Sequence, residues 1–260
     1  MENKENRKIA VVTGASRGIG KAISNKFIEK EWFVIKLDLS DDPDGKGLHH
    51  KNCCFISCDV SKEQDTLEVF QSIQQITSGK IDLLVNNAGI IEVGEFEEIP
   101  LEAQNRILDV NVKGVINCTY AALPLLKKTP NSQIINLCSA SALIGNPELT
   151  VYAASKSAVM SLTEGWAMGF KKYGIKVSDV LPMKVRTAMV FNYLGKYKDQ
   201  DETAVKLIPE DIANAIYRAS QKYKIHRSLG PNSSVFAFLT SILPYPVQFS
   251  ILKKVIKYRE

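Results

Sequence analysis

The feature that most constrains the fold is an alternation of short apolar runs with longer segments of helical periodicity, which continues to about residue 222. In most of these runs nearly every residue is apolar, with no alternation of polar and apolar residues, as expected for strands covered by helices on both faces. The candidate strands are residues 8–13, 32–38, 53–58, 81–86, 133–139 and 175–181. The helical patterns lie near residues 18–30, 62–77, 101–128 and 150–173. This order predicts a single-domain α/β protein with a doubly wound parallel sheet, helices on both faces, and ligands at the carboxyl ends of the strands.

Composition narrows the class of protein further. The 260 residues are 45% hydrophobic and 23% charged, with five cysteines, and neither a repeat nor a Pro/Gly-rich linker divides them. These values are typical of one globular domain with reduced thiols, and the polar start of the chain has no apolar secretory segment, so we expect a cytoplasmic protein. The net charge of +5 is small and mostly scattered, which argues against nucleic-acid binding. His49, His50 and His226 have no partners at ligand spacing, so no metal is predicted.

A glycine-rich turn follows the first candidate strand. Residues 13–20 read Thr-Gly-Ala-Ser-Arg-Gly-Ile-Gly and run directly into a helical pattern. Glycines there allow a tight turn and the close approach of a pyrophosphate, whose charge the free N–H groups of the helix start can meet. The alternative is a strand-to-helix connection without a ligand. The position after the first strand favours a dinucleotide, with these candidate contacts: Gly14, Ser16, Arg17, Gly18, Ile19 and Gly20.

The second candidate strand ends at Asp38, eighteen residues past Gly20. A carboxylate at this place accepts hydrogen bonds from the adenosine ribose and repels a 2′-phosphate. The alternative is a solvated loop acid, because further aspartates follow. Arg17 and Lys36 are cations that could hold a phosphate, so the sequence favours NAD(H) and leaves NADP(H) open.

These motifs, together with Asn86-Asn87-Ala88-Gly89 and Tyr152-x-x-x-Lys156, resemble those of the short-chain dehydrogenase/reductase family over roughly residues 8–190. The resemblance implies a Rossmann-type fold and subunits paired through long helices, as a homodimer or homotetramer. It also implies that Asp59 and Val60 cap the adenine, that Asn87 lines the adenosine side, and that Val185 and Thr187 contact the nicotinamide end. Ala88 and Gly89 belong to the same implied cofactor site.

The chemistry centres on Tyr152 and Lys156, which are four residues apart and therefore share one helix face. An ammonium beside a phenol favours the phenolate, so Tyr152 can exchange a proton with an alcohol oxygen. Ser139, at the end of the fifth candidate strand, can orient that oxygen; Ser141 is a competitor with a shorter spacing. The resemblance implies that Lys156 also holds the nicotinamide ribose and that Asn111 links Lys156 to solvent through water. The alternative for the Tyr/Lys pair alone is an exposed helix face without function.

One residue and two segments need separate comment, because they differ from the family pattern or bear on the substrate. Met183 stands after Pro182 where the family has glycine, which puts the shape of the nicotinamide pocket in doubt. Residues 187–208 form the implied substrate lid, and their apolar character suggests a lipophilic substrate. Residues 234–260 form an apolar C-terminal arm with a basic end, suited to peripheral membrane contact, to covering an apolar substrate, or to packing on a second subunit.

Together these features predict an NAD(P)-dependent oxidoreductase that moves a hydride between nicotinamide and the carbon of a small-molecule ketone or secondary alcohol. Tyr152 is the expected general acid and base. Two alternatives remain open: a non-catalytic regulator that binds a dinucleotide on the same fold, and an epimerase or dehydratase that uses the same tyrosine.

Overall fold

The computed structural model describes residues 7–40, 51–187 and 206–256, with side chains as far as residue 250. The strands are β1 (Ile9–Thr13), β2 (Phe33–Asp38), β3 (Cys53–Ser57), β4 (Leu83–Asn86), β5 (Gln133–Leu137), β6 (Lys176–Pro182) and β7 (His226–Leu229). The α-helices are α1 (Gly18–Glu29), α2 (Glu63–Ile76), α3 (Leu101–Leu108), α4 (Gly114–Lys127), α5 (Thr150–Gly169), α7 (Pro209–Gln221), α8 (Ser233–Ile242) and α9 (Tyr245–Ile256). A π-helix, η2 (Asp109–Lys113), joins α3 to α4, and the short 3₁₀ helices are η3 (Ala140–Ala142), η4 (Pro147–Leu149) and η5 (Lys171–Tyr173).

The strands form one parallel sheet in the order β3-β2-β1-β4-β5-β6-β7. The chain builds β1 to β3 outward in one direction and then returns to place β4 on the other side of β1. Loops leaving β1 and β4 therefore separate to opposite faces and open a crevice at the carboxyl edge of the sheet, where ligands of such folds bind. The predicted doubly wound parallel sheet is confirmed.

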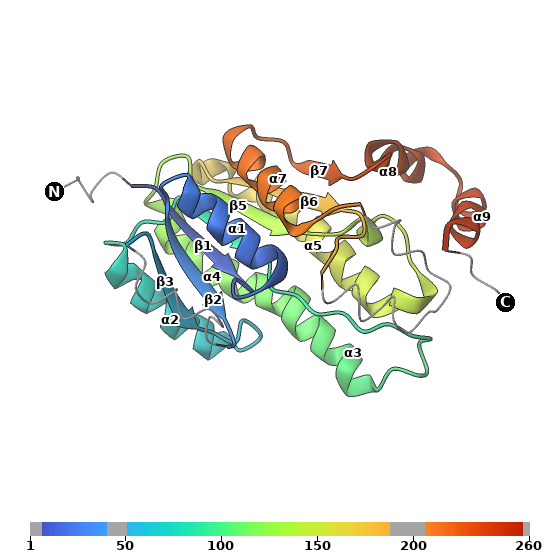
Figure 1. Cartoon of the computed structure of the whole chain (residues 1–260), viewed down its shortest axis with the longest axis horizontal. Coiled ribbons are helices and arrows are strands. Elements are labelled where there is room, and N and C mark those ends of the chain that lie inside the picture. The colour runs from blue at the N-terminus through green and yellow to red at the C-terminus, as the bar shows by residue number, and fades with distance from the viewer. Residues whose placement is uncertain (1–6, 41–50, 188–205, 257–260) are drawn as a thin grey trace.

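Helices cover both faces of the sheet (Figure 1). On one face, α1 and α7 bury Ile23, Phe27 and Ile216 against β1, β2 and β6. On the other, α2 and α4 bury Phe70 and Leu126 against the opposite sides of the same strands, and the end of α5 packs against this second core. The strands are apolar toward both layers, which explains why their sequence shows runs rather than alternation.

The structure differs from the sequence prediction at several boundaries. The predicted helix over 101–128 is interrupted by η2, and the predicted strand over 133–139 ends at Leu137, so that Ser139 lies in the following loop. Beyond residue 222 the structure adds β7, α8 and α9, where the sequence predicted an apolar arm with a basic end over residues 234–260 and assigned no helix or strand. The predicted lid, residues 187–208, falls largely outside the described residues.

Candidate active site

The glycine turn after β1 forms a cradle with no room for side chains at two positions. A Cβ on Gly14 would lie 2.8 Å from Ala88 Cα, and one on Gly20 would lie 1.9 Å from the Gly14 carbonyl oxygen. Gly14 also has a positive φ of 64°, which favours glycine. Within the described chain, no side chain caps the start of α1, so its first N–H groups face the turn. This cradle fits the pyrophosphate of a dinucleotide.

Asn87 fastens the loop after β4 to this turn. Its Nδ2 donates to the carbonyl oxygens of Thr13 (2.8 Å) and Gly14 (3.0 Å), while the backbone N–H groups of Asn87 and Ala88 both donate to Thr13 Oγ1 (3.0 Å each). The two loops that flank the crevice are therefore held together by hydrogen bonds. Asn87 thus fixes the shape of the predicted cofactor site.

Asp38 lies beside the glycine turn, where the sequence places it. Its Oδ2 accepts a hydrogen bond from the Ser16 backbone N–H at 2.9 Å, and its Oδ1 accepts one from the Leu39 N–H at 2.8 Å. A carboxylate has about four acceptor positions, so this carboxylate keeps capacity for the hydroxyl groups of a ribose. The side chain is half-buried at the end of β2, whereas Arg17 is exposed.

Asp59 and Val60 follow β3 at the same edge of the sheet. Asp59 accepts hydrogen bonds from Ser61 and forms an ion pair of 3.2 Å with Arg106. Burial raises the pKa of Asp59, but the Ser61 and Arg106 contacts outweigh it, so the pKa lies below its ordinary value. Val60 is buried and its carbonyl oxygen accepts from Asn117 Nδ2 at 3.0 Å. The predicted adenine contacts are thus held in fixed positions.

Tyr152 and Lys156 both project from the first turns of α5. Lys156 is buried, its Nζ donates to the Leu137 carbonyl oxygen at 2.9 Å, and it stands 5.7 Å from the centre of the Tyr152 ring. Ser139, just beyond β5, is hydrogen-bonded to the Tyr152 hydroxyl. Its Oγ also accepts from the Ser141 N–H at 3.1 Å. The structure brings Ser139, Tyr152 and Lys156 together.

Burial changes the acidity expected for this pair. It raises the pKa of Tyr152 from 10.0 to about 12, although the hydrogen bond with Ser139 acts to lower it. Burial also lowers the pKa of Lys156. The sequence predicted that the ammonium of Lys156 lowers the pKa of Tyr152 and so favours the phenolate. The pKa is raised instead, because loss of hydration has the largest effect and the Lys156 ammonium donates to the Leu137 carbonyl oxygen.

Asn111 lies at the centre of η2 and is fully buried. Its Oδ1 accepts from the Ile90 N–H at 2.9 Å, and its Nδ2 donates to the Ile90 carbonyl oxygen at 3.0 Å and to Ser155 Oγ at 3.1 Å. A Cβ placed on Gly89 would lie 3.3 Å from Asn111 Oδ1 and 3.6 Å from Lys156 Nζ, so both polar groups converge on Gly89. A π-turn inside a long helix often marks a functional site, and here it carries Asn111.

The loop after β6 completes the crevice. Met183 does not have a positive φ, so its backbone conformation does not require glycine. Its N–H donates to the Leu229 carbonyl oxygen at 2.9 Å. Val185 is buried, and the Thr187 methyl group lies 3.9 Å from where a Gly18 Cβ would be. Thr187 therefore lies beside the glycine turn.

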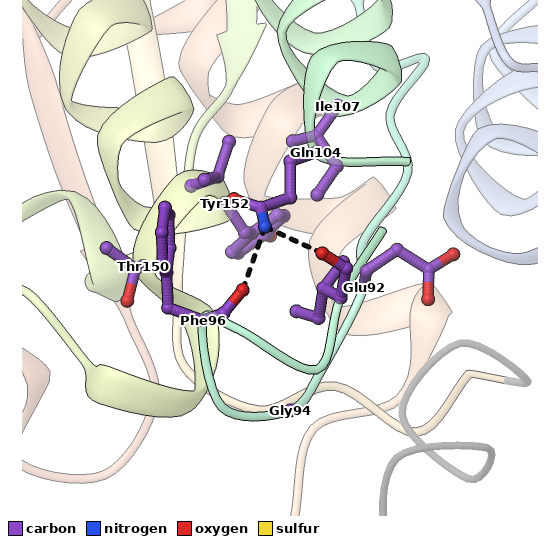
Figure 2. Close-up of a pocket in the computed structure, with 9 residues that line it drawn as sticks. Glu92, Gly94, Phe96, Gln104, Ile107, Thr150 and Tyr152 are labelled. Carbon is purple, nitrogen blue, oxygen red and sulfur yellow. Dashed lines mark hydrogen bonds between the residues drawn. The ribbon is translucent and has the colours of Figure 1, made fainter. Parts of the chain in front are cut away.

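A small pocket lies beside Tyr152 (Figure 2). Gln104 closes one side, since its Nε2 donates to the carbonyl oxygens of Phe96 (2.9 Å) and Ile99 (2.8 Å). The lining is mostly apolar, with one carboxylate. It consists of Glu92, Gly94, Phe96, Ile99, Gln104, Ile107, Thr150, Val151 and Tyr152.

Sequence reasoning did not identify several groups that hold the site together. The Leu137 carbonyl oxygen fixes Lys156, and Ser155 fixes Asn111. A backbone carbonyl leaves no trace in a sequence, and Ser155 has no distinctive spacing. The pocket residues from Glu92 to Ile107 had one available signal, which is their position between the fourth predicted strand and Asn111.

The fold and the site define an NAD(P)-dependent dehydrogenase or reductase. The family model described as short chain dehydrogenase matches residues 8–197. The chain is 34% identical over 208 residues to the 3-oxoacyl-[acyl-carrier-protein] reductase FabG of Thermotoga maritima, covering 78% of this chain and 82% of that protein. The chain belongs to the short-chain dehydrogenase family.

Solved structures agree with this assignment. The ligand-free aldohexose dehydrogenase of Thermoplasma acidophilum has a TM-score of 0.77 at 26% identity, covering 89% of this chain and 95% of that chain. The structure of ElxO with NADP bound has a TM-score of 0.79 at 24% identity, covering 88% of this chain and 99% of that chain, and supports the fold alone.

Proposed function

We propose that this protein interconverts a lipophilic ketone and the corresponding secondary alcohol, with NAD(H) as the preferred cofactor and Tyr152 as the general acid and base. The observation that carries the proposal is the cluster of Ser139, Tyr152 and Lys156 beside the glycine cradle. A regulator that only binds a dinucleotide has no need of a hydroxyl pair and a buried lysine at this place.

The roles follow from the contacts. A bound nicotinamide would supply the hydride for reduction of the carbonyl carbon and would accept a hydride in oxidation. Ser139 donates a hydrogen bond to the substrate oxygen and holds it against the Tyr152 hydroxyl, which gives the proton in reduction and takes it in oxidation. Lys156, fixed by its hydrogen bond to the Leu137 carbonyl oxygen, holds the nicotinamide ribose. Asn111, whose Oδ1 faces Gly89 as the Lys156 Nζ does, links Lys156 to solvent through water.

The preference for NAD(H) rests on Asp38. Its carboxylate lies next to the Ser16 N–H at the edge of the cradle, where it accepts from ribose hydroxyls and repels a 2′-phosphate. Arg17 is the opposing consideration, because an exposed cation in the turn can pair with a phosphate.

The proposal of a lipophilic substrate is based on the pocket beside Tyr152. Phe96, Ile99, Ile107 and Val151 give it an apolar lining. An apolar lining with few polar groups is typical of sites for apolar small molecules. Ile116 and Tyr120 on α4 and Met168 on α5 are exposed, which supports pairing of two copies through these helices.

The experiment that tests the proposal compares Tyr152→Phe with the wild type. The variant keeps the ring and loses only the hydroxyl group, so NADH binding, followed by fluorescence, should stay within about twofold while turnover of a ketone falls by about two to four orders of magnitude. Tyr173→Phe, which removes a hydroxyl group from an exposed tyrosine, is the matched control and should leave both unchanged.

A parallel pair of variants separates the two serines. Ser139→Ala should reduce turnover strongly, and Ser141→Ala only slightly. Retained turnover in Tyr152→Phe would refute the proposed acid and base, and a larger loss in Ser141→Ala than in Ser139→Ala would exchange the serine roles.

A further inference from the structure

Helices α8 and α9 follow the last strand and lie beyond the β7 edge of the sheet (Figure 1). They are joined to each other, because Gln248 Nε2 in α9 donates to the carbonyl oxygens of Thr240 (3.0 Å) and Leu243 (2.7 Å) at the end of α8. These are carbonyl groups that a helix end leaves without helical partners. We call the two helices, Ser233–Ile256, the C-terminal helix pair.

The helix pair presents apolar side chains to the outside. On α8, Val235, Phe238 and Ile242 are 57%, 61% and 57% exposed, and their spacing of three and four residues places them on one helical face. On α9, the rings of Tyr245 and Phe249 lie 6.1 Å apart and are 65% and 46% exposed. Helices at the surface of a globular protein normally turn such a stripe toward the core, so an outward stripe marks a docking surface.

The charge of this part of the chain indicates what docks there. No Asp or Glu stands between Asp211 and Glu260, whereas Lys253, Lys254, Lys257 and Arg259 follow the apolar stretch. Apolar and aromatic side chains combined with cations suit an anionic lipid surface, to which each cation near the surface adds attraction. A second copy docked by two-fold symmetry through these helices would instead bring the same cations toward one another.

We propose that the C-terminal helix pair docks on the surface of a membrane containing anionic lipids, with its apolar stripe in the headgroup boundary. Because the strands are parallel, the carboxyl end of β7, where α8 begins, lies on the same edge of the sheet as the candidate active site. Docking would bring this edge close to the bilayer. Among the helices that the structure describes, none is long and apolar enough to cross a membrane.

The test is flotation of the full-length protein with vesicles of phosphatidylcholine, with and without phosphatidylglycerol. The wild type should float with the anionic vesicles, and high salt should weaken its binding because salt screens the cations. The double variant Phe238→Ser/Phe249→Ser should bind at least about tenfold more weakly, since it removes two buried rings from the docked state. Ile76→Ser, at a half-exposed site at the end of α2, is the matched control and should float like the wild type.

Two results would overturn the proposal. One is a wild type that remains at the bottom of the gradient with anionic vesicles. The other is a wild type that is dimeric in analytical ultracentrifugation and a double variant that is monomeric but binds vesicles as strongly as the wild type. Circular dichroism verifies that the variants fold. Tyr152→Phe should float like the wild type, so that failure of docking and failure of the proposed chemistry are distinguished.

Discussion

At the scale of single residues, burial pushes the two ionisable side chains of α5 toward their uncharged forms. The pKa of Tyr152 is raised to about 12 and the pKa of Lys156 is lowered, in both cases mainly through loss of hydration. A phenol with a raised pKa is protonated at neutral pH and can serve as an acid without prior activation. In the oxidative direction the same phenol must first lose its proton.

The two directions should therefore respond differently to pH. We expect kcat/KM for ketone reduction to be nearly constant across neutral pH, and kcat/KM for alcohol oxidation to rise as pH increases, since the phenolate fraction grows toward the high pKa of Tyr152. In Ser139→Ala the hydrogen bond that lowers this pKa is lost, so the rise should move to higher pH. Stopped-flow rates in both directions measure this. An oxidation rate that falls above neutral pH would contradict it.

Asp38 carries the prediction about cofactor choice. Asp38→Asn removes the negative charge at the ribose position, so the ratio of kcat/KM for NADPH to that for NADH should increase by about tenfold or more. Glu63→Gln, which neutralises an acid in the first turn of α2, is the control and should leave this ratio unchanged. An unaltered ratio in Asp38→Asn would show that Asp38 does not set the preference.

At the scale of elements, β7 is fastened to β6 by a buried polar contact. His226 Nδ1 lies 3.0 Å from both carboxylate oxygens of the fully buried Asp179, and His226 Nε2 lies 3.2 Å from Glu164 of α5. The pKa of His226 is raised, chiefly by its hydrogen bond with Asp179. Burial raises the pKa of Asp179. The folded state therefore holds the proton of His226 more tightly than the unfolded chain does.

This contact makes stability depend on pH. Because the folded pKa of His226 is raised, its contribution is complete below the unfolded value of about 6.5 and is lost as pH rises through the folded pKa. We expect the difference in unfolding free energy between the wild type and His226→Gln to shrink from pH 6 to pH 9, measured by urea denaturation. A difference that is constant or grows over this range would contradict the assignment.

Phe27 connects α1 to its neighbours. It is fully buried, and its ring meets Trp32 edge-on at 5.0 Å and Tyr217 of α7 at 5.6 Å. Phe27→Ala should reduce the free energy of unfolding by about 3–5 kcal/mol, whereas Ile76→Ala at a half-exposed site should cost less than about 1 kcal/mol. Urea denaturation measures both. A loss below about 1 kcal/mol for Phe27→Ala would show that this contact is not part of the cooperative core.

The elements differ in how far the sequence predicts them. Six strands follow from apolar runs, because burial on both faces selects such runs. The seventh, His226–Leu229, is short and contains His226 and Arg227, so no apolar run marks it; its place is set by pairing with β6. The π-helix η2 around Asn111 could not be predicted either, because its apolar residues continue the helical periodicity of α3 and α4. The spacing of Ser139, Tyr152 and Lys156 predicted which side chains belong together, but not the contact of Lys156 with Leu137 or the raised pKa of Tyr152.

At the scale of the whole molecule, the strand order explains why motifs far apart in the chain form one site. The turn after β1 and the loop after β4 flank the point where the sheet changes direction, and Asn87 bonds them together. Ser139 after β5 and Thr187 after β6 reach the same edge. The carboxyl edge thus combines the glycine cradle, the cluster of Ser139, Tyr152 and Lys156, and the mostly apolar pocket beside Tyr152.

The most direct test of the central claim is transfer of deuterium from NADH labelled at C4 of the nicotinamide to a panel of ketones of increasing lipophilicity. The NADH carries deuterium at both C4 positions, because hydride transfer uses only one face of the ring. We predict that the wild type converts an apolar ketone to an alcohol that carries one deuterium on the carbinol carbon for each NADH consumed, detected by mass spectrometry. Tyr152→Phe should give almost none. Substrate conversion without net consumption of NADH, as an epimerase or dehydratase would show, or binding of NADH with no conversion of any ketone, as a regulator would show, would contradict the account.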